Sequence, residues 1–169
     1  MVVRVLFFFL MVRRQPGSTL FPYTTLFRSE NALAEDPRDA RFHLWAEGLQ
    51  EGLGLATVGE EVYVLQRGEL SRVSDTDGDD RVDRVETISM DWGLSGNYHE
   101  FGFGLPRDDA GSFYASFNVG FWDPQGWHGR SRAEHRGGGL RFAPDGRTPR
   151  VGGGVWGPGG LGRFGGAHG

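Results

Sequence analysis

The residues best suited to chemistry are the six acids in the stretch SDTDGDDRVDRVE, Ser74 to Glu86. Calcium takes six to eight oxygen ligands, and a short loop supplies them where carboxylates alternate along the chain. With Asp75 in the first place, acids fall in places one, three, five, nine and twelve of such a loop. The spacing therefore predicts a calcium-binding loop with these ligands: Asp75, Asp77, Asp79, Asp83 and Glu86.

Asp80 stands in the sixth place of this loop, where glycine normally permits a left-handed turn, and Asp is among the residues that tolerate that conformation. The flanks favour strands over helices, as in the calcium loops of certain β-propellers, which the loop resembles. In loops of that kind Asp75, Asp77, Asp79 and Asp83 would be sufficient. A solvated hairpin turn that binds no ion explains the same acids and remains the alternative.

A second candidate is the segment FWDPQGWHGRSRAEHRGGG, which interleaves Trp122 and Trp127 with polar side chains. Exposed indoles beside hydrogen-bonding groups can bind a sugar ring, and long loops often carry binding sites. The same tryptophans could instead cover a core between sheets. His128 and His135, seven residues apart, are weak grounds for a metal site.

The elements that would position these residues are short strands. Val62 to Leu65 and Leu70 to Val73 are apolar runs separated by the Arg67-Gly68-Glu69 turn, and Gly59 to Glu61 makes an earlier turn. After the acidic loop, the apolar residues between Val82 and Ile88 predict a further strand, although their spacing also fits a helical turn.

A weak recurrence suggests how these strands are organised. Units of glycine, apolar strand, acidic turn and second strand begin at Gly52, Phe101 and Gly137. The intervals, roughly 35 to 50 residues, are in the range of a propeller blade, although any β-hairpin gives a similar pattern. We expect an all-β fold: a fragment of a β-propeller comprising two to three blades.

Composition limits the possible functions. The chain has 169 residues, of which 29 are glycine and 13% aromatic, so it is not polar enough to predict disorder. A formal net charge of −4 does not indicate the basic surface that nucleic-acid binding requires. Cysteine is absent, which excludes disulfides and thiolate metal sites, and no apolar run reaches the ~18 residues of a membrane span.

The two ends of the chain differ from its middle. TLFPYTTLFRS, within the first 29 residues, reads as the translation of a sequencing adapter, so we expect residues 1–29 to be non-native rather than an export signal. We expect a linker or surface turn over residues 30–47, a partial propeller over 48–151, and a disordered or truncated glycine-rich end over 152–169.

The order DTDGD, NYHEFGFGLPRD and GSFYASF resembles the membrane-bound dehydrogenase domain of planctomycete-type proteins, over roughly Gly48 to Val151. That family is similar to quinoprotein glucose and sorbosone dehydrogenases, six-bladed propellers that use pyrroloquinoline quinone and calcium. The resemblance implies oxidation of a sugar or alcohol, with His99 as general base, in a periplasmic or extracellular parent protein whose c-type haem domain accepts the electrons. A histidine that only closes a strand end is the alternative for His99.

The chain departs from the quinoprotein pattern at two places. Asn118 and Val119 stand where those relatives carry an aspartate that assists the histidine. Trp156 and Gly157 stand where an arginine-asparagine pair grips the quinone, and neither makes the bidentate contact of a guanidinium. We therefore expect this chain alone to be inactive. A non-catalytic propeller that binds polysaccharide or a partner protein through Trp122 and Trp127 is the alternative function.

Overall fold

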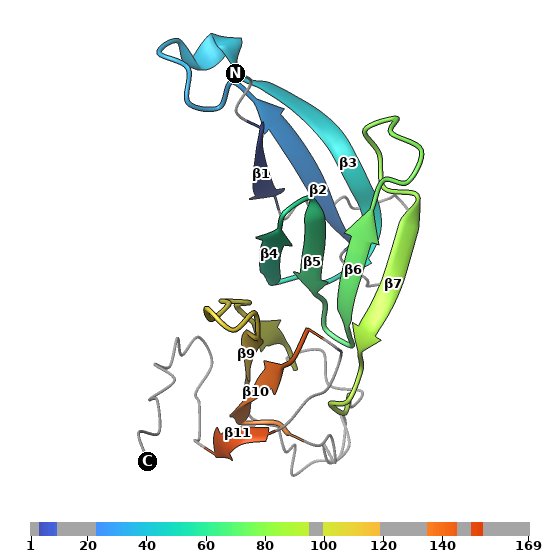
Figure 1. The fold of residues 1–169 in the computed structure, drawn as a ribbon, viewed down its shortest axis with the longest axis vertical. Coiled ribbons are helices and arrows are strands. Elements are labelled where there is room, and N and C mark those ends of the chain that lie inside the picture. The colour runs from blue at the N-terminus through green and yellow to red at the C-terminus, as the bar shows by residue number, and fades with distance from the viewer. Residues whose placement is uncertain (1–3, 10–22, 95–99, 119–134, 145–149, 154–169) are drawn as a thin grey trace, which may run out of the picture.

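The computed structural model describes residues 4–9, 23–94, 100–118, 135–144 and 150–153, and this part is all-β (Figure 1). Its strands form three small antiparallel sheets, and the described residues include no α-helix. The strands are β1 (Arg4–Phe9), β2 (Tyr23–Glu30), β3 (Arg41–Gln50), β4 (Gly54–Val58), β5 (Glu61–Leu65), β6 (Leu70–Ser74), β7 (Arg84–Ser89), β8 (Gly102–Phe103), β9 (Phe113–Phe117), β10 (Gly138–Phe142) and β11 (Arg150–Gly153).

Each sheet is a meander in which consecutive strands are hydrogen-bonded neighbours. The orders are β1-β2-β3, β4-β5-β6-β7 and, read from the other edge, β11-β10-β9-β8. The strands expected over 62–65 and 70–73 are confirmed as β5 and β6. The strand expected after the acidic loop is confirmed as β7, which begins only at Arg84. Gly59, with φ of 61°, forms the tight β4–β5 turn.

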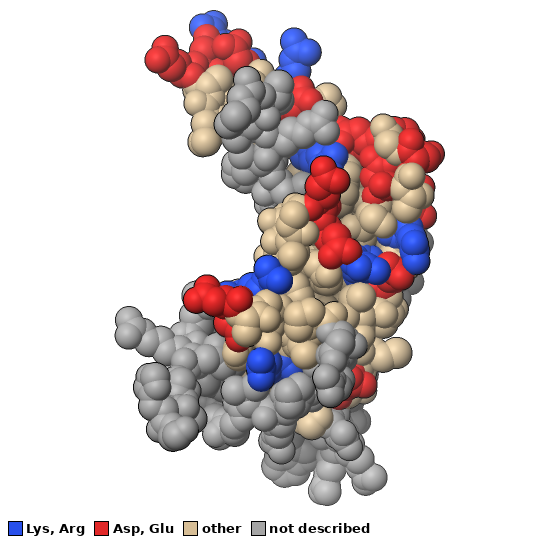
Figure 2. All heavy atoms as spheres, viewed as in Figure 1, with Lys and Arg blue, Asp and Glu red and all other residues tan. Residues whose placement is uncertain are grey.

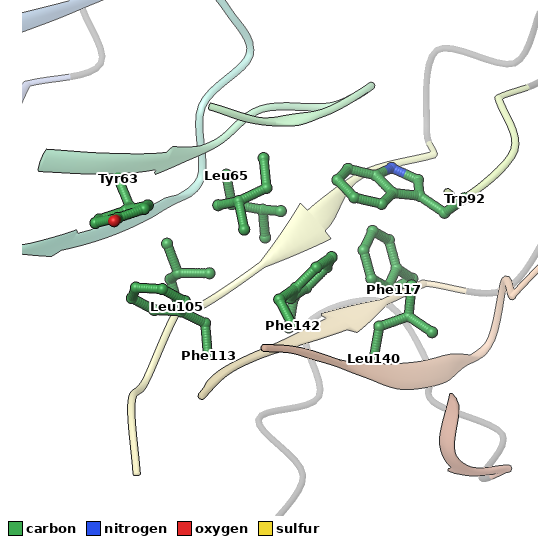
Figure 3. Packing of buried hydrophobic residues seen from close by; sticks show 10 residues of the cluster. Tyr63, Leu65, Trp92, Leu105, Phe113, Phe117, Leu140 and Phe142 are labelled. Atoms are coloured by element: carbon green, nitrogen blue, oxygen red, sulfur yellow. The ribbon is translucent and has the colours of Figure 1, made fainter. Parts of the chain in front are cut away.

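The sheet β4–β7 is covered on both faces. Successive residues of a strand point to opposite faces, so Tyr63 and Leu65 lie on one side of β5 while Val62 and Val64 lie on the other. The first side packs against β9 and β10 (Figure 3), and the second packs against β2 and β3. The two buried clusters are Tyr63, Leu65, Leu70, Trp92, Leu105, Phe113, Ala115, Phe117, Leu140 and Phe142, and Leu26, Trp45, Ala46, Leu49, Val62, Val64 and Val73.

The start of β4 and the end of β8 touch through their backbones. The amide of Gly104 donates to the carbonyl of Leu53 at 3.3 Å. A Cβ atom added to Gly54 would lie 2.2 Å from the Gly104 carbonyl oxygen, and Gly104 itself has φ of +73°. Only glycine at Gly54 permits this approach. It brings an edge strand of one four-stranded sheet against an edge strand of the next.

The N-terminal sheet contains segments for which the sequence predicted no structured role. β1 and nearly all of β2 fall within residues 1–29, the part expected to be non-native. The expected surface turn appears at Pro37–Asp39, a 3-10 turn in which the Asp36 carboxylate accepts from the Arg38 amide. Residues 41–47, at the end of the expected linker, belong to β3. The apolar residues Leu44 and Trp45 and the register against β2 explain this difference.

Replacing Phe117 with alanine should lower the free energy of unfolding by about 3–5 kcal/mol, because a fully buried aromatic ring leaves a cavity. The matched control is Phe42→Ala on β3, where the ring is 55% exposed. Its expected change is within about 0.5 kcal/mol. Urea unfolding of both variants measures the difference. Equal costs would contradict the packing of β9 against the sheet β4–β7.

Candidate metal centre

The loop between β6 and β7 begins with a carboxylate that organises the backbone around it. Asp75 accepts a hydrogen bond from the amide of Gly78 at 2.7 Å through Oδ1, and from the amide of Asp80 at 2.9 Å through Oδ2. Short-range bonds of this kind favour a tight turn over a strand. They fix the Asp75 carboxylate at the centre of the loop.

Asp77 and Asp79 repeat this arrangement further along the loop. Each accepts from the amide two residues ahead, Asp79 N to Asp77 Oδ1 at 3.2 Å and Arg81 N to Asp79 Oδ1 at 2.9 Å. As a result, ligand atoms of Asp75, Asp77 and Asp79 all lie within 4.8 Å of one another. Acidic side chains gather at this end of β6 and β7 in Figure 2. Hard carboxylate oxygens at this spacing suit calcium chemically.

The sixth place of the loop has the left-handed backbone expected for it. Asp80 has φ of 67°, in the region that glycine usually occupies, and Gly78 has φ of 82°. The Asp80 carboxylate forms an ion pair with the Arg28 guanidinium, which also lies 4.8 Å from the centre of the Trp45 ring. Asp80 therefore acts as a turn residue with a salt-bridge partner.

The last two predicted ligands have other partners. Asp83 accepts from the Thr76 amide at 3.0 Å and from its hydroxyl at 2.5 Å, and the hydroxyl bond is the main reason that its pKa lies below its usual value. Glu86 lies on β7, where Arg72 donates to its Oε2 at 2.7 Å and lowers its pKa. Asp83 thus closes the loop, and Glu86 belongs to a charge pair across β6 and β7.

The loop is attached to the neighbouring sheet. The amide of Val82 donates to the Trp45 carbonyl on β3 at 2.7 Å, and Val82 packs partly against the cluster that contains Trp45. Val82, at place eight of the loop, thus anchors the loop to the neighbouring sheet. A pocket of about 840 Å³ runs from Trp45 past the β4–β5 turn to Asp75, so the first acid of the loop borders an open space.

The other predicted site residues lie outside the described part of the chain. These are His99, Trp122 and Trp127, together with Trp156 and Gly157 at the expected quinone contact. Asn118, which replaces the expected aspartate, is described: its Oδ1 accepts from the Phe101 amide at 2.8 Å. The Asn118 side chain therefore connects the end of β9 to the residue before β8.

A buried group of charges next to Asn118 was not foreseen from the sequence. Arg67 lies 3.4 Å from Glu51, and Arg136 lies 3.9 Å from Glu100, with all four side chains at most 13% exposed. Burial lowers the pKa of Arg136, an effect that Glu100 opposes and Arg67 increases. The glutamates and arginines are scattered along the chain, so only their burial reveals the group.

The chain matches no protein-family model, no curated protein and no solved structure. Among the described residues, no helix is long and apolar enough to cross a membrane. The same part of the chain holds one group of three acids that could bind a metal ion, and it is the group in the loop between β6 and β7.

Calcium should raise the melting temperature, because an ion that binds only the folded state stabilises it by about 2.7 kcal/mol at a hundred times its Kd. For a chain of 169 residues this corresponds to roughly 5–11 °C, measured by thermal scans with calcium and with chelator. Asp77→Asn should reduce the shift, since its amide oxygen still accepts from the Asp79 amide and can still ligate calcium but lacks the charge.

The control for this measurement is Asp109→Asn, an exposed acid outside the loop, which should leave the calcium shift intact. If calcium gives no shift in the unchanged chain, the loop is a solvated turn.

Proposed function

We propose that the described β4–β11 region forms two consecutive blades of a quinoprotein-dehydrogenase-like β-propeller, and that the β6–β7 loop binds calcium as a structural ion. The observation that carries the proposal is the convergence of Asp75, Asp77 and Asp79 within 4.8 Å at the end of a four-stranded meander.

The sheet arrangement supports the propeller part of the proposal. Blades of a propeller are four-stranded antiparallel meanders that bury their faces against neighbouring blades. The sheets β4–β7 and β8–β11 are meanders of that size, and their facing side chains share one core. The backbone contact of Gly54 with Gly104 joins β4 to the end of β8. Neighbouring blades would meet in this way at their inner strands.

The donor chemistry supports calcium as the ion. The three carboxylates use some of their acceptor capacity on backbone amides, and each oxygen retains a further lone pair for an ion. Their mutual repulsion falls when a divalent cation lies among them. The ion would hold the β6–β7 hairpin in its observed shape, without taking part in a reaction.

The enzymatic part of the proposal concerns oxidation of a sugar or alcohol. Pyrroloquinoline quinone supplies the hydride acceptor in such enzymes, and the histidine at the position of His99 removes the hydroxyl proton. Trp156 and Gly157 do not fit the quinone, because neither offers a cation to its carboxylates. We therefore assign this chain the dehydrogenase-like scaffold and no turnover of its own.

A dye-reduction assay with added quinone, calcium and aldoses should give no rate above the protein-free blank. Restoring the arginine-asparagine pair with Trp156→Arg and Gly157→Asn should tighten quinone binding, measured by equilibrium dialysis. The matched control carries Trp156→Lys with Gly157→Asn.

We expect the arginine version to bind about tenfold more tightly than the lysine version, because a planar guanidinium makes two parallel bonds to a carboxylate. Turnover by the unchanged chain would show that it is not inactive. Equal binding by the two double variants would contradict the expectation that residues 156 and 157 stand at the quinone-binding position of those dehydrogenases.

A further inference from the structure

The outer edge of β4 presents backbone groups that no described strand pairs with. β4 stands at one edge of its sheet, beside β5. The β4–β5 hairpin is closed by Val58 and Glu61 around a two-residue turn, which makes them a hydrogen-bonded pair. Because hydrogen-bonded and non-hydrogen-bonded pairs alternate along antiparallel strands, the amides and carbonyls of Leu55 and Thr57 point away from β5.

The start of this edge is covered and the remainder is open. At the start of β4, the Leu53 carbonyl accepts from the amide of Gly104. Beyond it, Leu55 is half-buried and Thr57 is exposed, and within the described part of the chain their outward groups have no hydrogen-bond partner. The molecule is hollowed on this side of β4 (Figures 1 and 2). A strand edge in this condition can pair with another chain.

The open edge borders the pocket of about 840 Å³ that lies next to Trp45. Leu55, Ala56 and Thr57 all line this pocket, and Val62 adds to its apolar wall. Its volume is in the range of sites that hold drug-sized ligands. Successive residues of a strand added to β4 would point to opposite sides of the sheet, so every second side chain could enter the pocket.

The charges of the pocket select the side chain that it would hold. Glu60 and Asp75 line it and form no ion pair among the described residues, whereas its arginine, Arg28, is paired with Asp80. A lysine or arginine side chain suits such a place. Its methylene stem packs along the apolar wall while its cation faces the carboxylates.

We propose that the open edge of β4 is a docking site for an extended, basic segment of a partner protein. The segment pairs with the outward backbone groups of Leu55 and Thr57 and inserts a lysine or arginine side chain into the pocket. In this mode of binding the backbone bonds supply affinity and the pocket supplies specificity. The inference goes beyond the proposed function and requires neither calcium nor quinone.

The test uses the full chain with chelator present, so that calcium does not compete at Asp75. The probe is a blocked heptapeptide, Thr-Val-Thr-Lys-Thr-Val-Thr. At saturation, hydrogen exchange at the Leu55 and Thr57 amides, followed by NMR, should slow roughly 10–100-fold, because both amides gain an acceptor. The Ala56 amide already points to β5 and should change little. This alternation is the signature of a strand added to β4.

Thr57→Pro tests the backbone bonds. Proline is tolerated on an edge strand where the N–H points away from the sheet, so this change removes one outward donor and keeps the β4–β5 ladder. It should weaken peptide binding about tenfold, measured by titration of the Gly59 amide shift. Thr57→Val keeps the amide and is the matched control, which should bind as the unchanged chain does.

The charge of the pocket is tested from the side of the peptide. A peptide with norleucine in place of lysine keeps the stem and lacks the cation, so it should bind the unchanged chain about two- to fivefold more weakly. Glu60→Gln should reduce this difference. Glu35→Gln, at an exposed acid between β2 and β3, is the matched control and should preserve it.

The docking site is overturned if the peptide leaves exchange at Leu55 and Thr57 unchanged, if Thr57→Pro binds as tightly as Thr57→Val, or if the lysine and norleucine peptides bind equally. Sedimentation identifies the other occupant that such an edge could take. A dimer that Thr57→Pro makes monomeric would assign the edge to a second copy of this chain and would equally overturn the proposal. None of these outcomes depends on dye reduction or on the calcium shift.

Discussion

The structure depends on burial of both faces of the sheet β4–β7. An antiparallel sheet commonly keeps one face in water, and its strands then alternate apolar with polar residues. β5 does not alternate: Val62 to Leu65 are all buried, because β9 and β10 cover one face while β2 and β3 cover the other. The sequence EVYVL therefore belongs to a strand that needs a sheet on each side. A single sheet could not bury it.

Buried charged side chains lie at one end of the interface between the sheets β4–β7 and β8–β11. At one end, Trp92, Phe117 and Phe142 pack ring to ring, with centroids 5.1 and 5.5 Å from the tryptophan. Beside them lie the buried arginines, with Arg136 5.6 Å from the Phe117 ring centre. Charges in such a place are tolerated only with partners. Arg67 Nε also donates to the Glu100 carbonyl, and this bond restricts how the sheets can shift relative to each other. An apolar interface alone would permit more registers.

The sequence predicted the features that depend on local pattern. The apolar runs and acidic turns gave β5, β6 and their connections, and the place of Asp80 in the loop register anticipated its positive φ. It did not predict where β3 begins, since the polar residues around Pro37 suggested a linker that ran to residue 47. Arg41–Gln50 forms a strand paired with β2. That pairing cannot be recognised from the sequence of the segment alone.

The ion-pair partners of the acidic residues also could not be predicted from the local sequence. Spacing alone placed Glu86 in the calcium set, but pairing of β6 with β7 sets it opposite Arg72. Side chains that lie opposite each other on paired strands interact directly, and the spacing of residues along a loop does not reveal such pairs. The same holds for Glu100 and Arg136, which are brought together only by the meeting of β8, β9 and β10.

Hydrogen bonds within the loop between β6 and β7 hold its carboxylates close together. Backbone amides of Gly78, Asp79 and Asp80 satisfy the carboxylates of Asp75 and Asp77, while Thr76 fixes Asp83. These bonds bring three negative charges together, and repulsion among them opposes the folded state. A cation would thus act by relieving that repulsion within the turn. Its effect would extend to β3 through the Val82 amide, which donates to the Trp45 carbonyl beneath the loop.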